Sequence, residues 1–146
     1  MAIQTSAGST FAIATALPAT YDATGYNALT WSLIGEVTDI GEFGKEYNLV
    51  THTPVAGRQV QKLKGSYNNG AITLQMARDQ AAGSNQDKLK TGLASDASYA
   101  FKVTLQDGTK MYFTGKIMSY KTQVGSVDQV TGASTAIELD SDVVEV

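Results

Sequence analysis

Residues 59–118 read QVQKLKGSYNNGAITLQMARDQAAGSNQDKLKTGLASDASYAFKVTLQDGTKMYFTGKIM, and this stretch decides the fold. It holds two sets of alternating apolar and polar residues, each interrupted by a turn sequence, with a short helical pattern between them. We find no catalytic motif inside it. This order predicts a mainly β protein with one helix, built from antiparallel hairpins.

Asn69-Gly70 is the first turn sequence, and both residues tolerate the positive φ that a type I′ turn requires. A two-residue loop at this point would pair Tyr67 with Ile72. In that register one face of the two strands is mostly apolar and the other mostly polar, and a slip of one residue would mix them. We therefore predict a hairpin between the strands that flank Asn69-Gly70.

A second hairpin is predicted around a three-residue loop at 106–108. This loop sets Val103 opposite Met111 and Phe101 opposite Phe113, whereas a two-residue turn would put the two sides on opposite faces. It also places the glycine of Asp-Gly at the left-handed position of a bulged turn.

The return strand of this hairpin has apolar residues on both faces. Tyr112, Met118 and Tyr120 are expected on the face opposite Phe113. A strand that is solvated on one side normally has a polar outer face. We therefore expect the helix or another subunit to cover these three side chains.

The helix is predicted over residues 85–94. Ser84 and Asp87 have the spacing of a capping box, which satisfies free backbone N–H groups at a helix start. Leu89 and Leu93 are four residues apart, so both can face a sheet.

The flanking segments divide into strands and loops by the same criteria. Strands are expected within residues 11–17, 31–40 and 137–146. Loops are expected at residues 19–30, 41–57 and 125–134. A loop as long as 41–57 is usually functional or mobile in a compact domain.

Composition narrows the class of protein. The chain has 146 residues, which suits one domain, and 14 acidic against 11 basic residues, which argues against a dedicated nucleic-acid binder. It has no cysteine, no apolar run long enough to span a bilayer and no signal-peptide pattern. We therefore expect a soluble protein that is made in the cytoplasm and not secreted.

The search for reactive groups gives no enzyme signature. His52 is the single histidine, and an isolated loop histidine is usually solvated or hydrogen-bonded. Gly44-Lys45 and Gly115-Lys116 lack the glycine spacing and the Ser or Thr of a phosphate loop. We expect no catalytic residue, no metal and no cofactor.

Two groups of like charge mark candidate surfaces. They are the basic group Arg58, Lys62 and Lys64, and the acidic group Glu138, Asp140 and Asp142. Like charges at alternate positions of a strand repel, so the acidic group needs water or cations nearby. Ordinary solvent exposure explains both groups. Alternatively, the acidic group contacts the basic face of a neighbouring copy or lines an aqueous channel.

Several segments occur in a recognisable order. They are IGEVTDIGEFG at 34–44 with the loop after it, AITL at 71–74, the helix, YAFKV at 99–103 with its Asp-Gly turn, YFTGKI at 112–117 and the acidic terminal strand. In this ordered set the chain resembles the major tail tube proteins of long-tailed bacteriophages, from about residue 31 to the C-terminus.

The resemblance implies a β-sandwich or split barrel of two antiparallel sheets with a flanking α-helix and a long inter-subunit loop. It implies a single tail-tube domain over residues 1–146, with residues 1–30 as an N-terminal arm. Subunits would form hexameric rings that stack into a hollow tube, and one sheet of each subunit would join its neighbours in a continuous β-barrel lining. A related tube of a contractile tail or secretion system is an alternative, as is a monomeric β-sandwich binding module.

The resemblance also implies binding partners, a location in the virion and a role for the long loop. Partners are other copies of the chain, the tape-measure and tail-end proteins, and double-stranded DNA that passes through the lumen without sequence-specific binding. The protein would be part of the virion. Residues 41–64 would reach the adjacent ring, and residues 41–57 would be mobile in a free subunit and become ordered on stacking.

Three sets of candidate residues follow from these implications. The stacking set is Gly41, Phe43, Tyr47, His52, Pro54, Arg58, Lys62 and Lys64. The sheet-interface set is Tyr112, Met118 and Tyr120. An acidic or neutral lumen would let DNA slide, because a basic lining binds phosphate. The lumen candidates are therefore Thr73, Gln75 and Asp79, with Glu138, Asp140 and Asp142 as rivals.

Overall fold

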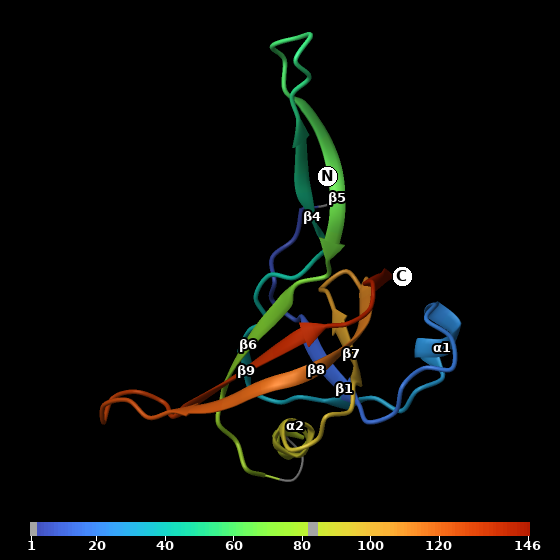
Figure 1. The fold of residues 1–146 in the computed structure, drawn as a ribbon. Coiled ribbons are helices and arrows are strands. Elements are labelled where there is room, and N and C mark those ends of the chain that lie inside the picture. Colours follow the sequence, from blue (N-terminus) through green and yellow to red (C-terminus); the bar gives the residue numbers. More distant parts are fainter. Residues whose placement is uncertain (1–2, 82–84) are drawn as a thin grey trace.

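The computed structural model describes residues 3–81 and 85–146, and in this part of the chain the strands form two antiparallel sheets (Figure 1). The larger sheet has eight strands in the order β2-β1-β7-β8-β9-β6-β3, with β10 also paired to β8, and the smaller one contains β4 and β5. The predicted fold class, mainly β with two antiparallel sheets and a flanking helix, is confirmed.

The strands are β1 (Thr10–Ala14), β2 (Ser32–Leu33), β3 (Val37–Asp39), β4 (Glu46–His52), β5 (Gln61–Asn68), β6 (Ala71–Ala77), β7 (Tyr99–Thr104), β8 (Lys110–Gln123), β9 (Gly132–Leu139) and β10 (Val144–Glu145). The helices are α1 (Ala23–Asn27) and α2 (Gln86–Leu93).

The large sheet is rolled up, because its two edge strands are close neighbours in the sequence. β2 pairs with β1 at one edge, and β3 pairs with β6 at the other. Between them, the Ile34 amide donates to the carbonyl of Phe11 and the carbonyl of Glu36 accepts from the Ala77 amide, each at 2.9 Å. The short link between β2 and β3 therefore connects both edges and gives a split barrel.

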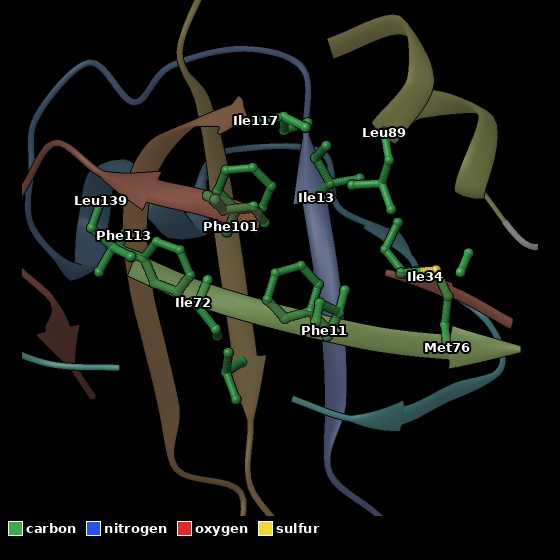
Figure 2. Close-up of a cluster of buried hydrophobic side chains, with 14 residues drawn as sticks. Phe11, Ile13, Ile34, Ile72, Met76, Leu89, Phe101, Phe113, Ile117 and Leu139 are labelled. Carbon is green, nitrogen blue, oxygen red and sulfur yellow. The ribbon is translucent and has the colours of Figure 1, made fainter. Parts of the chain in front are cut away.

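The core fills the inside of this barrel. Phe11, Phe101 and Phe113 come from β1, β7 and β8, and their ring centroids lie 5.5 Å apart for Phe101 and Phe113 and 5.7 Å apart for Phe11 and Phe101 (Figure 2). Leu89 of α2 is fully buried with the aliphatic side chains at one end of the same cluster. Each fully buried large apolar side chain contributes about 1.5–3 kcal/mol through its removal from water.

The predicted hairpin of β7 and β8 is confirmed. Phe101 lies opposite Phe113 and Val103 opposite Met111. The Leu105 amide donates to the carbonyl of Thr109 at 2.8 Å, which leaves a three-residue loop whose glycine has a φ of 93°. The left-handed glycine and the apolar pairing agree, so local sequence was enough to specify this register.

The predicted hairpin around Asn69-Gly70 is wrong. β5 pairs with β4, whereas β6 pairs with β9 and β3. A type I′ turn needs positive φ at both central residues, but only Gly70 has it, at 82°. The side chains of β6 alternate between buried and exposed. The strand pairs over seven residues with β9, which is far from it in the sequence.

The predicted loop 41–57 contains β4 and belongs to a long, kinked hairpin. The register that sets Val37 opposite Met76 continues, within one residue, to His52 opposite Gln61. β3 and β4 thus form one arm and β5 and β6 the other, with the tip at 53–60, and Figure 1 shows the outer part projecting from the body. Residues 46–52 are therefore a paired strand, and the expectation of an irregular loop there is wrong.

A glycine lies where the hairpin leaves the body. Gly41 has a φ of 84°, and a Cβ atom built on it would lie 2.8 Å from the carbonyl oxygen of Thr73 on β6. Glycine is required here because no other residue combines this dihedral angle with so close a backbone contact.

A bulge changes the face that β8 presents. The register shifts between Ile117 and Ser119, so Tyr112, Met118 and Tyr120 do not share a face as predicted. Met118 is 59% exposed, whereas Tyr120 packs against the main core. The extra residue reverses the alternation, which is the effect that a β-bulge has on a strand.

A short helix covers Tyr112 on the outer face of β8. Residues 19–30 were expected to be a loop, but they contain α1, whose start is capped by Asp22 Oδ1 accepting from the Gly25 amide at 2.8 Å. The Tyr26 ring stacks on Tyr112 with centroids 5.1 Å apart. Burial raises the pKa of both phenols.

The helix predicted over 85–94 is present as α2. Ser84 of the proposed capping box lies outside the described residues. Leu89 is buried as expected, but Leu93 is 41% exposed, so the prediction that both leucines face the sheet is wrong for Leu93. The helix is tied down by buried Gln86, whose side-chain amide donates to the carbonyls of Ala77 at 2.8 Å and Gly35 at 3.1 Å.

Three further boundaries differ from expectation. The strand within 11–17 is β1, and the strand expected over 31–40 is divided at Glu36, which has a φ of 60°. The terminal strand expected over 137–146 is divided into β9 and β10, and β9 starts inside the expected loop 125–134. In the described part of the chain, neither helix has the length and apolar character needed to cross a membrane.

Candidate functional site: assembly surfaces

The outer hairpin, β4 and β5, is exposed on both faces. Every residue of β4 is exposed, and so is every residue of β5 except the partly exposed Gly65. The hairpin nevertheless carries large apolar side chains, with Leu49 65% exposed. These exposed apolar residues are Tyr47, Leu49, Val50, Val55, Val60, Leu63 and Tyr67. Several large apolar side chains exposed together on one element are typical of a protein–protein contact.

One face of the hairpin combines aromatic rings and ammonium groups. Tyr47 and Tyr67 lie opposite each other, with ring centroids 5.3 Å apart. Lys45 Nζ lies 4.3 Å from the centroid of Tyr67, and Lys64 Nζ lies 4.9 Å from that of Tyr47. The structure therefore brings Tyr47 and Lys64 of the stacking set together, and these cation–π contacts order an otherwise exposed strand pair.

The other face and the tip are less polar. Val50 lies directly opposite Leu63, and His52 opposite Gln61. At the tip, the Gly57 amide donates to the carbonyl of Pro54 at 3.2 Å, which leaves Val55 fully exposed.

The remaining stacking candidates on the outer hairpin are accessible. Lys62 lies opposite Thr51 on β4, and Arg58 is exposed at the tip. His52 is exposed as well, and no group of His, Asp or Glu suited to hold a metal ion occurs among the described residues.

Two stacking candidates belong to the body instead of the projecting hairpin. Gly41 lies against β6, and the Phe43 ring packs on Phe113 with centroids 5.6 Å apart. At the base of the hairpin, Lys45 Nζ forms an ion pair with Asp142 Oδ1 at 3.4 Å. These contacts fix the root from which the outer hairpin projects.

A polar sheet face lies on β6 and β9. Thr73 and Gln75 are exposed on β6, and they lie opposite Ala136 and Ser134 on β9. Glu138 is exposed on the same face. Neither strand contains Lys or Arg, but on the same face of the neighbouring strand β8 Lys116 lies opposite Glu138 and Lys121 opposite Ser134.

The three acids near the C-terminus do not form one row, so that expectation is wrong. Glu138 is on β9 opposite Lys116, but the chain leaves the strand after Leu139. Asp140 accepts hydrogen bonds from the Thr114 hydroxyl at 2.6 Å and the Ser98 hydroxyl at 2.5 Å, and Asp142 pairs with Lys45. Asp140 and Asp142 thus make contacts within the chain, and Glu138 is the one of the three on the open sheet face.

Asp79 lies beyond β6, in the connection to α2. Its backbone amide donates to Gln86 Oε1 at 3.1 Å, and its carboxylate accepts from the Ala81 amide at 2.9 Å. Asp79, a lumen candidate together with Thr73 and Gln75, is therefore not on the same strand as those two residues, because β6 ends at Ala77.

Of the sheet-interface candidates, Tyr112 is unavailable to another subunit. Its side chain is 1% exposed, and its hydroxyl donates to Asn27 Oδ1 at 2.7 Å. Tyr120 faces inward, where its hydroxyl lies 3.3 Å from Gln86 Oε1. Met118 remains exposed on the outer face.

Sequence reasoning missed an apolar loop between β8 and β9. Figure 1 shows these two strands running out from the body to a loop at residues 124–131. Val124, Val127 and Val130 are all strongly exposed there. Their regular spacing by three residues was a signal that could have been read from the sequence.

The single chain thus leaves the projecting hairpin and the polar face of β6 and β9 exposed. A family described as "Phage tail tube protein, TTP" matches residues 3–146. No curated protein matches. The chain belongs to the phage tail tube protein family, as its sequence resemblance predicted.

Solved structures of tubes and tails share this fold. The SPP1 tail tube has 10% sequence identity and a TM-score of 0.64, over 94% of this chain and 75% of that one. A tail from a gene transfer agent particle, refined with C6 symmetry, has 14% identity and a TM-score of 0.63, over 91% and 92%. A sheath/tube terminator of an extracellular contractile injection system has 9% identity and a TM-score of 0.72, over 100% and 98%.

Proposed function

We propose that this chain is the structural subunit of a phage tail tube. Its copies assemble as hexameric rings, the rings stack into a hollow conduit, and double-stranded DNA passes through that conduit into the host. The C6 symmetry of the similar gene transfer agent tail supports six copies per ring. A closed ring also removes free sheet edges, which otherwise invite uncontrolled pairing.

The observation that carries this proposal is the projecting hairpin of β4 and β5. A monomer gains nothing from holding Leu49, Val50 and Leu63 in water on a strand pair that packs against no body. Burial against the next ring would remove them from solvent. The hairpin and its root, residues 41–64, are thus the stacking element of the single tail-tube domain.

The open face of β6 and β9 is the lumen lining in this proposal. Thr73, Gln75 and Glu138 present hydroxyl, amide and carboxylate groups and no cation. Phosphates bind to proteins by releasing counterions from Lys and Arg contacts, so β6 and β9 offer DNA no such contact, whereas Lys116 and Lys121 on the same face of β8 lie opposite Glu138 and Ser134.

The role is structural and not catalytic, and the protein acts in the virion after synthesis in the host cytoplasm. Further partners are the tape-measure protein, which fills the lumen before DNA, and the tail-end proteins. Residues 1–30, expected as an N-terminal arm, supply α1 with much of the cover over Tyr112, and also β1, whose Phe11 lies in the core.

A second candidate is the inner tube of a contractile tail or injection system. The TM-score of 0.72 to the contractile system's terminator favours it, since the alignment spans 100% of this chain. Both candidates need the same rings, and they differ in whether a sheath protein binds the outer surface.

Negative-stain electron microscopy of concentrated protein tests the proposal. Wild-type protein should form hollow tubes. Val55→Asp at the hairpin tip should give rings without tubes, because a charge would have to lose its water in the stacking contact. Val55→Thr, which keeps the shape of the side chain, should still stack. A wild-type protein that stays monomeric at every concentration would favour a binding module and end the tube proposal.

A further inference from the structure

The Asn69-Gly70 sequence connects the projecting hairpin to the body, and the fold does not use it as a hairpin turn. β5 ends at Asn68 and pairs with β4, whereas β6 begins at Ala71 and pairs with β9 and β3. An Asn-Gly sequence also has a chemical property, because glycine carries no Cβ that would shield its backbone nitrogen from the side chain before it. The Asn69 carboxamide and the Gly70 nitrogen can therefore react with each other.

The reaction is the loss of ammonia from Asn69. The Gly70 nitrogen gives up its proton and forms a bond to Asn69 Cγ, the Cγ–Nδ2 bond breaks, and ammonia leaves with that proton. The succinimide ring that results takes up one water at either of its carbonyl carbons and opens to aspartate or to isoaspartate. This chemistry needs only the chain and water, so the local structure around Asn69 sets its rate.

Either product would disturb the base of the hairpin. Aspartate places a carboxylate where Asn69 is now partly buried. Isoaspartate carries the main chain through the side chain and so adds one methylene group between β5 and β6. Gly70 has little room for such a shift, because its carbonyl accepts from the Leu139 amide at 3.0 Å and a Cβ built on it would lie 3.1 Å from the carbonyl oxygen of Gly44.

The fold restrains the attacking nitrogen. The Gly70 amide donates to Asn68 Oδ1 at 2.8 Å, and Gly70 has a left-handed backbone with a φ of 82°. This hydrogen bond stabilises the protonated amide, which is the form that cannot attack. Asn69 Oδ1, in contrast, is buried without a hydrogen-bond partner in the described part of the chain, so no such bond holds the carboxamide through its oxygen. The restraint thus acts on the nitrogen and comes from Asn68.

We propose that Asn69 is a site of spontaneous deamidation and that the side chain of Asn68 suppresses the reaction in the folded protein. Asn68 is a positioning residue, since it acts only through the Gly70 amide. An unfolded chain lacks the contact, so deamidation marks chains that have opened at the base of the hairpin. The inference uses contacts within one chain and holds whether or not the protein forms tubes. In a tube subunit the damage would persist, because an assembled particle makes no new protein.

Replacement of the acceptor tests the proposal. Asn68→Ala should deamidate at Asn69 roughly five to ten times faster than wild type in the folded state, because one neutral hydrogen bond to the attacking nitrogen is lost. Asn68→Asp keeps an acceptor oxygen at the same position and should react no faster than wild type. Folded wild type should also react more slowly than wild type unfolded in urea. Peptide mass spectrometry after incubation at neutral pH locates the product, and circular dichroism confirms that each variant is folded.

A matched control separates this effect from general loosening of the hairpin. Asn48→Ala removes a side-chain hydrogen bond between the same two strands, from Asn48 Nδ2 to Ser66 Oγ at 3.0 Å, and should deamidate at the wild-type rate. Equal rates for wild type and Asn68→Ala, or equal acceleration by Asn48→Ala, would overturn the proposal. So would fast reaction of Asn68→Asp, or a folded wild type that reacts as fast as the unfolded chain. Tube formation by wild-type protein is a separate outcome, which microscopy decides.

Discussion

At the scale of the residue, the role that the sequence suggests for Tyr112 differs from the role that the fold gives it. In the sequence it is an aromatic residue on the unexplained face of a strand, which suggests a contact with another subunit. In the structure its ring stacks on Tyr26, and its hydroxyl donates to Asn27 Oδ1 at 2.7 Å. The cover comes from α1 of the same chain, because α1 holds Tyr26 against β8.

Tyr112→Phe should lower the free energy of unfolding at neutral pH by about 1 kcal/mol, through the lost hydrogen bond, and leave assembly unchanged. Burial raises the pKa of Tyr112 above 10.0, so the folded state holds the phenol proton more tightly than the unfolded state. The associated stability is complete below pH 10.0 and is lost as pH rises through the folded pKa. Urea unfolding of the free subunit between neutral and strongly alkaline pH should show a smaller alkaline loss in Tyr112→Phe. Superimposable pH profiles would contradict the burial of this phenol.

At the scale of the element, the long hairpin formed by β3, β4, β5 and β6 has one part in the body and one part that projects from it. Its arms are continuous in register from β3 to β4 and from β5 to β6, but they leave the body at Gly41 and Gly70. β6 stays in the large sheet beside β9, while β5 projects with β4. The bend therefore separates a part that builds the core from a part that is free to contact another ring.

Gly41→Ala should disturb the backbone where the long hairpin leaves the body and should lower the stability of the folded protein. The residue would have to hold a left-handed backbone, at about 1–2 kcal/mol, with its Cβ 2.8 Å from the carbonyl oxygen of Thr73. Thermal unfolding and tube yield should both fall. Gly57→Ala is the matched control, since its Cβ would meet only Pro54 Cγ, at 3.9 Å, and it should be neutral. Equal effects of the two substitutions would contradict a specific role for Gly41.

At the scale of the whole molecule, a well-packed barrel carries a projecting hairpin, β4 and β5, whose side chains are exposed on both faces. The barrel buries three phenylalanines and the aliphatic cluster around Leu89, whereas the outer hairpin is held by cross-strand pairs and by the contacts of Lys45 and Lys64 with tyrosine rings. Segments with exposed hydrogen bonds and few buried contacts open most easily.

Hydrogen exchange should therefore be fast in Glu46–Asn68 of a free subunit and slow in the assembled tube. β7 should be protected in both states, because its register is covered on both sides by β1 and β8. Exchange measured by mass spectrometry on the two states tests this. Equal protection of the hairpin in both would mean that stacking does not order it.

The sequence alone determined the features that depend on neighbouring residues. The β7–β8 register follows from the Asp107-Gly108 turn and from alternation that a one-residue slip would destroy, and α2 follows from a local helical pattern. The tail tube resemblance and the mainly β class also came from the order of segments. Only the tertiary structure decided the partners of β5 and β6, the bulge at Met118 and the burial of Tyr112. The physical reason is that a strand is stabilised by whichever partner buries its apolar face best. For β6 that partner is β9, about sixty residues away in the chain. No local turn rule can identify a partner at that distance.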